Sequence, residues 1–224
     1  MKNGFTLIEL LIGILIAMLC MIMLLVLFNQ ISKISLESMQ DAQYDSQVQT
    51  GSLIIQKLIQ NAGYGSGRSV DIATGTYNSK PAIFWRFLSS DPTDPLATQI
   101  YKCEGLVSEN ELTNKEYKLY LLSNANTCGK DTNLTNAALW NNPDLVKKSP
   151  LISIKNQLIT TNTDPIFKFS VHDLPEGKNC TPYGISENNP AGYKYVVVNA
   201  KSKNLAIKDI QQIICLNNIF RSIT

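Results

Sequence analysis

The first 28 residues, MKNGFTLIEL (1–10) followed by LIGILIAMLCMIMLLVLF (11–28), decide how this chain must begin to fold. Residues 10–28 are nineteen residues without a charge. As a helix they extend about 28 Å, which is close to the hydrocarbon thickness of a bilayer. A secretory signal peptide has a shorter apolar core and a cleavage site of small residues after it, and neither is present here. The sequence therefore predicts a membrane span that stays on the protein.

Glu9 places a carboxylate at the start of this predicted span. An acidic residue in hydrocarbon costs on the order of 3 kcal/mol, so it usually has a partner and a function. In the first turn of a helix the carboxylate also interacts favourably with the helix dipole. Glu9 is therefore a candidate functional residue.

Residues 29–60 continue the helix beyond the span. They contain no proline and a single glycine, Gly51. Apolar residues recur at steps of three, four and seven positions, with charged residues between them. This pattern predicts an amphipathic helix with one buried stripe. The stripe consists of Ile34, Tyr44, Val48, Ile55, Leu58 and Ile59. The helix is expected to run from residue 5 to about residue 60 and to end at NAGYGSG (61–67), where Gly63 is suited to a C-terminal cap.

Residues 4–9, GFTLIE, resemble the processing motif of type IV prepilins and the related pseudopilins. A short basic leader, a hydrophobic segment and a long helix make up that family's architecture. The resemblance implies that a prepilin peptidase cleaves between Gly4 and Phe5 on the cytoplasmic face and methylates the new amino group. It also implies that Glu9, then the fifth residue of the mature chain, pairs with the amine of a neighbouring subunit during assembly. The absence of proline from residues 5–60 departs from many major pilins and argues against a major subunit.

The rest of the chain, residues 63–224, is rich in Asn, Ser, Thr, Pro and Gly. Six runs have strand composition: 81–87, 98–102, 116–122, 165–171, 193–199 and 212–217. We expect an α+β fold in which an antiparallel β-sheet domain packs on the apolar stripe of the helix, as the pilin-like fold implies. The predicted parts are a leader (1–4), a transmembrane half of the helix (5–28), an amphipathic half (29–62) and a periplasmic or extracellular β-rich domain (63–224).

Cysteine usage favours an oxidising compartment. Cys20 lies in the span, and four others lie downstream: Cys103, Cys128, Cys180 and Cys215. An even number of cysteines beyond a membrane segment predicts disulfides, although four free thiols are the alternative. Local closure favours Cys103–Cys128 and Cys180–Cys215, but three pairings are open and the sequence does not select one.

Motifs that suggest catalysis or ligand binding have simpler structural interpretations. His172, beside Asp173, lacks an accompanying nucleophile motif and is expected on the solvent side of a strand. Asp91 and Asp94 lack the further oxygen ligands of a calcium loop. The glycines of residues 63–67 follow a helix, whereas a dinucleotide fingerprint follows a strand. We therefore predict no enzyme, no cofactor and no metal site.

The charge of the chain does not point to nucleic acid. The formal net charge is +2 and the pI is about 8.2, so no strong field attracts an acidic partner. Two small basic clusters, Lys147-Lys148 and Lys201 with Lys203, are expected to be solvated surface. DNA is conceivable as a partner of a tip subunit but unsupported.

Three further features give little information about function. Trp85 and Trp140 are expected to be packing residues rather than ligand platforms. Asn133-Leu134-Thr135 matches an N-glycosylation sequon, a match that carries little weight in a bacterial-type protein.

The helix end, LIQNAGYG (58–65), resembles the corresponding region of PilW-type minor pilins, and GspJ-type pseudopilins have a similar size and a related helix end. A soluble part of this size is also large for a major pilin. The resemblance implies a minor type IV pilin that helps prime and assemble a pilus used in adhesion, twitching motility or DNA uptake, with a position at the tip. One alternative is a J-type minor pseudopilin of a type II secretion system, and a weaker one is a membrane-anchored periplasmic enzyme or binding protein.

The same resemblance implies the partners and the location. The partners are other minor and major pilins, the prepilin peptidase, the inner-membrane assembly platform and, before assembly, the membrane itself. The expected location is the inner membrane, crossed once, with a cytoplasmic N-terminus and a periplasmic C-terminal domain. After assembly the subunit is expected in the pilus at the cell surface.

Overall fold

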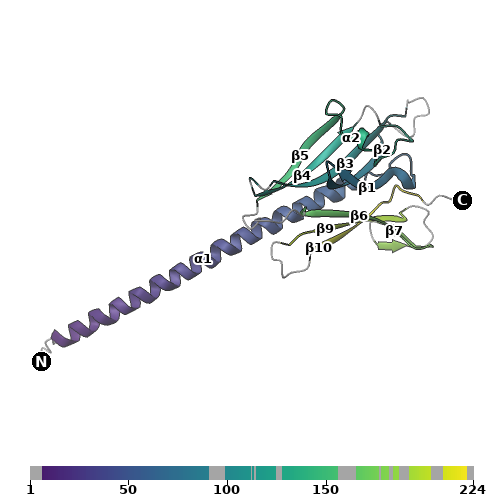
Figure 1. The fold of residues 1–224 in the computed structure, drawn as a ribbon. Helices are drawn as coiled ribbons and strands as arrows, with labels where there is room; N and C mark the ends of the chain where they lie inside the picture. The colour runs from purple at the N-terminus through teal and green to yellow at the C-terminus, as the bar shows by residue number, and fades with distance from the viewer. Residues whose placement is uncertain are drawn as a thin grey trace. The chain divides into compact units, whose positions relative to one another are not determined.

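The structure is a computed structural model, and it describes residues 7–90, 99–111, 113, 115–124, 128–155, 165–176, 178–181, 184–186, 192–202 and 209–220. The chain divides into two compact units, Met1–Gln43 and Tyr44–Thr224. The first unit contains the N-terminal part of helix α1 (Leu7–Ile59), and the second contains the end of α1 and all the described strands (Figure 1). The expected α+β fold, with a long N-terminal helix followed by antiparallel sheets, is confirmed.

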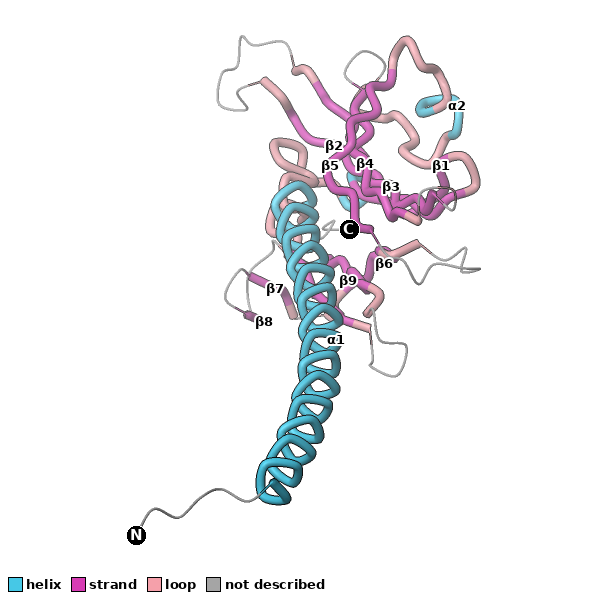
Figure 2. The backbone as a smooth tube through the Cα atoms, turned by 90° about the vertical axis from the view of Figure 1, so that its left-hand side faces the viewer, coloured by secondary structure: helices cyan, strands magenta, loops and turns pink. Residues whose placement is uncertain are grey.

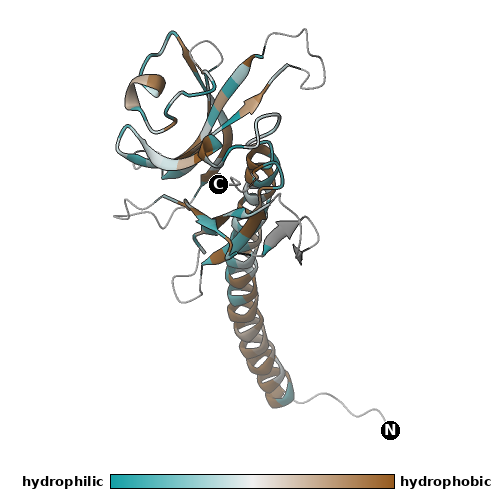
Figure 3. Cartoon of the chain, turned by 90° about the vertical axis from the view of Figure 1, so that its right-hand side faces the viewer, coloured by the Kyte–Doolittle hydropathy of each residue, from teal (hydrophilic) through white to brown (hydrophobic). Residues whose placement is uncertain are grey.

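In the first unit, residues 10–28 of α1 are apolar on all sides, and much of this part of the helix is brown in Figure 3. Its most apolar 18-residue window has a mean hydropathy of 3.2, and none of that window is buried within the protein. By length and composition this helix is able to cross a membrane. Ile34, which we expected in the buried stripe, is 66% exposed. This expectation was wrong because the amphipathic spacing does not tell where the docked part of the helix begins.

In the second unit, α1 buries one stripe against the β domain. The buried positions are Tyr44, Val48, Gly51, Ile55 and Ile59, while Leu58 is partly buried beside them. Their spacing of three or four residues places them on one helix face. The helix contains no further buried residue within its described length, so the docked stripe begins at Tyr44.

The end of α1 agrees closely with the expected boundary. The last helical residue is Ile59, and turns follow through residue 66. Gly63 has φ +75°, a left-handed backbone that glycine adopts without strain. Its N–H donates to the carbonyl of Arg86 at 2.9 Å, which ties the turn to a strand.

Within the described residues, the strands form three antiparallel sheets, whose strands Figure 2 shows in magenta. The largest has the order β1 (Ile72–Tyr77), β2 (Lys80–Leu88), β3 (Tyr101–Glu111), β4 (Glu116–Asn124) and β5 (Val146–Lys155). The second has the order β10 (Ile210–Cys215), β9 (Lys194–Ala200) and β6 (Phe167–Asp173). The third pairs β7 (Asn179–Thr181) with β8 (Gly184–Ser186). A short 3-10 helix, η1 (Ser69–Asp71), precedes β1, and a single turn, α2 (Ala137–Trp140), precedes β5.

Five of the expected strand runs coincide with β2, β4, β6, β9 and β10. The run 98–102 was placed too early, because β3 begins at Tyr101 and continues to Glu111. The sequence did not predict β1 and β5, which are the two edges of the large sheet. Edge strands tolerate glycine, lysine and proline, and β5 contains Pro150 beside an irregularity in its register with β4.

The large sheet has a hydrophobic cluster on each face. One cluster contains the buried stripe of α1 and residues of both larger sheets, including Trp85 of β2. The other contains Phe84 and Trp140, whose rings stack with centroids 4.5 Å apart. Successive side chains of a strand point to opposite faces of the sheet. The neighbours Phe84 and Trp85 of β2 therefore lie in different hydrophobic clusters.

Candidate functional site

The first candidate site is the N-terminal motif. Gly4 and Phe5, the predicted processing residues, lie outside the described residues. Glu9 lies in the first turn of α1, at the beginning of the apolar helix. A carboxylate here faces the partial positive charge of the helix N-terminus. The position also puts Glu9 four residues, about one turn, after the amine that cleavage at Gly4 would create.

A second feature covers the outer face of the large sheet. We call residues 128–146 the loop cap. Its apolar residues Leu134, Leu139 and Trp140 are buried against β2, β3 and β4. The Trp140 indole N–H donates to the carbonyl of Leu134 at 2.7 Å, and the Asn124 side-chain amide donates to the carbonyl of Leu139 at 2.8 Å. These contacts attach the loop cap to the sheet despite its lack of long secondary structure.

A disulfide fastens the beginning of the loop cap to the sheet. It joins Cys103 on β3 to Cys128, with Cα atoms 5.5 Å apart. This is one of the two bonds that local closure favours. Cys215 is disulfide-bonded as well, but the side chain of Cys180, its expected partner, lies outside the described residues. Cys20 is a free thiol on α1.

Removal of the Cys103–Cys128 bond should weaken the domain. The two cysteines are 25 residues apart, so the chain-entropy relation gives a loss of roughly 3.5 kcal/mol in the free energy of unfolding. We expect the variant with both Cys103→Ser and Cys128→Ser to unfold at a clearly lower urea concentration than the unmodified chain, with both measured in detergent without reductant. An unchanged midpoint would show that the loop cap does not depend on this bond.

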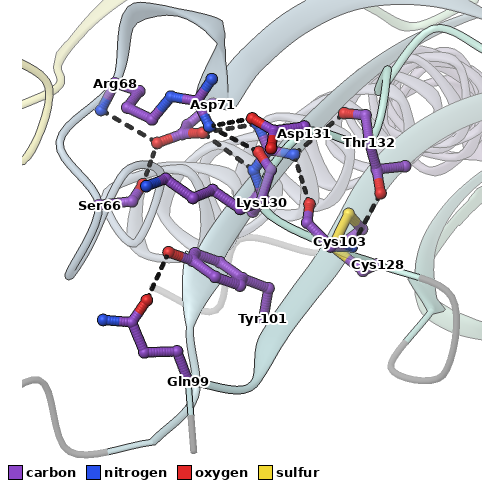
Figure 4. Close-up of polar contacts among 12 residues, drawn as sticks. Ser66, Arg68, Asp71, Gln99, Tyr101, Cys103, Cys128, Lys130, Asp131 and Thr132 are labelled. Atoms are coloured by element: carbon purple, nitrogen blue, oxygen red, sulfur yellow. Dashed lines mark hydrogen bonds and ion pairs between the residues drawn. A yellow bond between two sulfur atoms is a disulfide. The ribbon is translucent and has the colours of Figure 1, made fainter.

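Arg86 and Asp71 form an ion pair inside the protein. Their side chains are 1% and 0% exposed, and two guanidinium nitrogens, Nε and Nη2, lie 2.9 and 2.8 Å from Asp71 Oδ1. Arg86 Nη1 also donates to the carbonyls of Gly129 at 2.7 Å and Thr132 at 3.0 Å. Arg86 therefore links β2, the 3-10 helix before β1 and the loop cap. Figure 4 shows its partners Asp71 and Thr132 side by side with other polar residues of this region. A buried charge needs such partners, because an unpaired one is strongly destabilising.

The second oxygen of Asp71 is also bonded. It accepts hydrogen bonds from the Ser66 hydroxyl and from the backbone N–H of Arg68. The Arg68 guanidinium reaches the loop cap at the surface, with Nη1 at 2.7 Å from the Lys130 carbonyl and 3.0 Å from Asp131 Oδ1. An open cavity of about 560 Å³ lies beside this network, and Arg68, Thr132, Asn133 and Lys194 contribute to its lining.

Among the described residues of the second unit, three ionisable groups have shifted pKa values. Burial raises the pKa of Tyr44, whose hydroxyl donates to the Lys201 carbonyl at 2.8 Å. Burial also raises the pKa of Glu104 on β3. A hydrogen bond to Glu111 raises the pKa of Lys118 at the surface. These shifts have structural causes, and the three groups do not converge on one cavity.

The other sequence candidates lie apart from one another. His172 is exposed on β6, stacks on Tyr195 with centroids 5.3 Å apart and contacts the Ser170 hydroxyl at 2.8 Å. Its neighbour Asp173 pairs with Lys194. Within the described residues, no group of three or more His, Cys, Asp or Glu side chains is arranged to hold a metal ion.

The remaining candidates are surface or packing residues. Trp85 and Trp140 are 0% and 2% exposed and belong to the two cores, as expected. Lys148 lies on the surface, paired with Glu109 at 2.8 Å and 4.0 Å above the ring of Tyr120. Asp91, Asp94 and Lys203 lie outside the described residues.

Sequence reasoning missed the Arg86–Asp71 pair. One signal was present: Arg86 interrupts the apolar run AIFWRFL of β2. A charged residue in such a run is rarely buried without a partner. The partner itself was not predictable, because Asp71 and the accepting carbonyls become neighbours only through the fold.

Comparison with known proteins supports the N-terminal motif. Residues 1–25 match the family model of the prokaryotic N-terminal methylation motif. No curated protein sequence matches the chain significantly. Among solved structures, the chain is similar to a type IV-like pilin from Thermus thermophilus, with 9% identity and a TM-score of 0.34 over 78% of this chain and 97% of that one. This structural likeness is too weak to carry the function, whereas the motif is specific.

Proposed function

We propose that this protein is a minor type IV pilin, a structural subunit that helps prime and assemble a pilus and is located at its tip. The observation that carries the proposal is the methylation motif over residues 1–25, directly before a helix able to cross a membrane. Processing after Gly4 and N-methylation of Phe5 follow from the motif. The antiparallel β domain that follows the helix is compatible with this role.

Glu9 supplies the chemistry of assembly in this proposal. Processing creates a positively charged amine on Phe5, and a carboxylate in an apolar environment needs such a partner. Pairing between Glu9 of one subunit and the Phe5 amine of a neighbour neutralises both charges as the helix leaves the bilayer. The partners are therefore other pilins, brought together at an inner-membrane assembly platform, and the processing enzyme is a prepilin peptidase.

The proposed topology follows from the same motif and from the cysteines. The leader is cytoplasmic, α1 crosses the inner membrane once, and the β domain lies in the periplasm before it reaches the cell surface in the pilus. The Cys103–Cys128 disulfide supports an oxidising compartment for the β domain.

Deletion of the gene tests this assignment. A minor pilin is needed for filaments, so the deletion strain should lose surface pili while secretion of extracellular enzymes continues. Intact pili together with lost secretion would instead identify a J-type pseudopilin of a type II secretion system. Complementation with the unmodified gene controls for effects on neighbouring genes.

A Glu9→Gln variant should separate processing from assembly. Cleavage and methylation are expected to continue, because Gly4 and Phe5 are unchanged, but incorporation into filaments should be largely lost without the carboxylate. Immunoblots of the membrane fraction follow processing, and immunoblots of sheared pili measure incorporation into filaments. Glu37→Gln, which removes an exposed carboxylate farther along α1, is the matched control, and equal incorporation of both variants would contradict the role of Glu9.

A further inference from the structure

We propose that Asn133 is an acceptor for an N-linked glycan, attached in the periplasm. It stands in the sequence Asp131-Thr132-Asn133-Leu134-Thr135 of the loop cap. The Asn-X-Thr sequence is the general acceptor for this modification when it is exposed on an exported protein. The inference rests on the proposed export of the β domain and goes beyond the role in assembly.

The loop cap presents the acceptor atom to solvent. The side-chain oxygen of Asn133 accepts hydrogen bonds from the Thr135 N–H at 3.0 Å and from the Thr135 hydroxyl at 2.8 Å. Its Nδ2, the atom that carries a glycan, makes no hydrogen bond to the described part of the chain, and the residue is exposed. The side-chain oxygen is thus held by the loop while the nitrogen remains accessible.

The residues around Asn133 leave room for a sugar. Leu134 is 2% exposed and its carbonyl accepts from the Trp140 indole, so the core contact of this loop is made by the residue next to the acceptor. Asn133 itself lines the open cavity described above, together with Arg68, Thr132 and Lys194. A glycan on Asn133 can therefore extend over this open cavity without displacing the core.

Asp131 distinguishes this sequon from a second one. Its side chain is 83% exposed and lies two positions before the acceptor. The other Asn-X-Thr sequence, Asn179-Cys180-Thr181, has Gly177 at the equivalent position. The negative charge gives a transferase a contact at Asn133 that is absent at Asn179, so we expect selective modification of Asn133.

The reaction transfers a sugar from a polyprenyl-diphosphate-linked oligosaccharide by an oligosaccharyltransferase. The bond from Asn133 Nδ2 to the anomeric carbon forms, and the bond from that carbon to the diphosphate oxygen breaks. The polyprenyl diphosphate leaves with the bonding electron pair, and the amide nitrogen gives up one proton to a base of the transferase. No oxidant or reductant is needed.

The test is co-expression of the full chain with a lipid-linked oligosaccharide and a bacterial oligosaccharyltransferase that requires an acidic residue two positions before the asparagine. Mass spectrometry of peptides should find the glycan on Asn133. It should be lost in Asn133→Gln, Thr135→Ala and Asp131→Asn, and retained in Thr135→Ser and Asn179→Gln. In each variant the redox state of Cys103 and Cys128 is measured as well, to show whether the β domain has been exported.

Three results would overturn the inference in different ways. A chain that is exported, with Cys103 and Cys128 oxidised and the β domain open to added protease, but without glycan on Asn133, contradicts the acceptor site alone. A chain that remains inside the cell with both cysteines reduced contradicts the proposed topology and the acceptor site with it. Glycan found on Thr135→Ala would also contradict the role of the sequon.

Discussion

A Gly4→Arg variant is expected to accumulate in the membrane as an uncleaved, unmethylated precursor. The bond between Gly4 and Phe5 is the proposed cleavage site, and a peptidase site shaped for glycine has no room for a large charged side chain. Without cleavage no amine forms on Phe5 to pair with Glu9 of a neighbouring subunit, so assembly should fail too. Intact-mass spectrometry of the purified protein reads the first step, and immunoblots of sheared pili read the second.

Asn3→Arg is the matched control for this experiment. It introduces the same side chain one residue earlier and leaves the glycine in place, so processing should continue. If Gly4→Arg protein were found in filaments with its leader attached, cleavage would be unnecessary and the proposed mechanism of assembly would be wrong.

The second large effect is expected in the β domain, from Arg86→Met. This substitution removes the guanidinium but leaves Asp71 buried, and breaking a buried pair in this way costs about 3–5 kcal/mol. The carbonyls of Gly129 and Thr132 lose a donor as well. For a domain of this size the melting temperature should fall by roughly 10 °C. Thermal unfolding of the full chain in detergent, followed by fluorescence of Trp85 and Trp140, measures the change.

Arg68→Met provides the comparison. Its ion pair with Asp131 lies at the surface, where such pairs contribute at most about 1 kcal/mol, so only a small shift is expected. The double variant Arg86→Met, Asp71→Leu removes both buried charges and should regain part of the stability that Arg86→Met loses. Equal melting temperatures for Arg86→Met and Arg68→Met would mean that the buried pair does not hold the loop cap.

The sequence predicted best where a local pattern determines the structure. The apolar run, the end of α1 near residue 60 and the strands β2, β4, β6, β9 and β10 all have such patterns. The Cys103–Cys128 bond also occurs as local closure favoured. By contrast, β1 and β5 are edge strands, whose composition is less restricted.

Features that depend on the tertiary fold were not predictable. Ile34 and Tyr44 both belong to the stripe expected from the sequence, but Ile34 is 66% exposed whereas Tyr44 is buried. The Arg86–Asp71 pair brings together a strand, a 3-10 helix and carbonyls of the loop cap, a combination with no sequence spacing of its own. The exposure of Asn133 beside the buried Leu134 likewise became visible only in the folded loop.

The N-terminus of the mature protein tests the central claim most directly. We predict that mass spectrometry of protein purified from the membranes of its own cells will identify an N-terminal peptide that begins at Phe5 and carries one methyl group on its amine. A peptide that begins at Met1, with Gly4 and Phe5 still joined, would contradict the assignment to the type IV prepilins and with it the proposed role of Glu9.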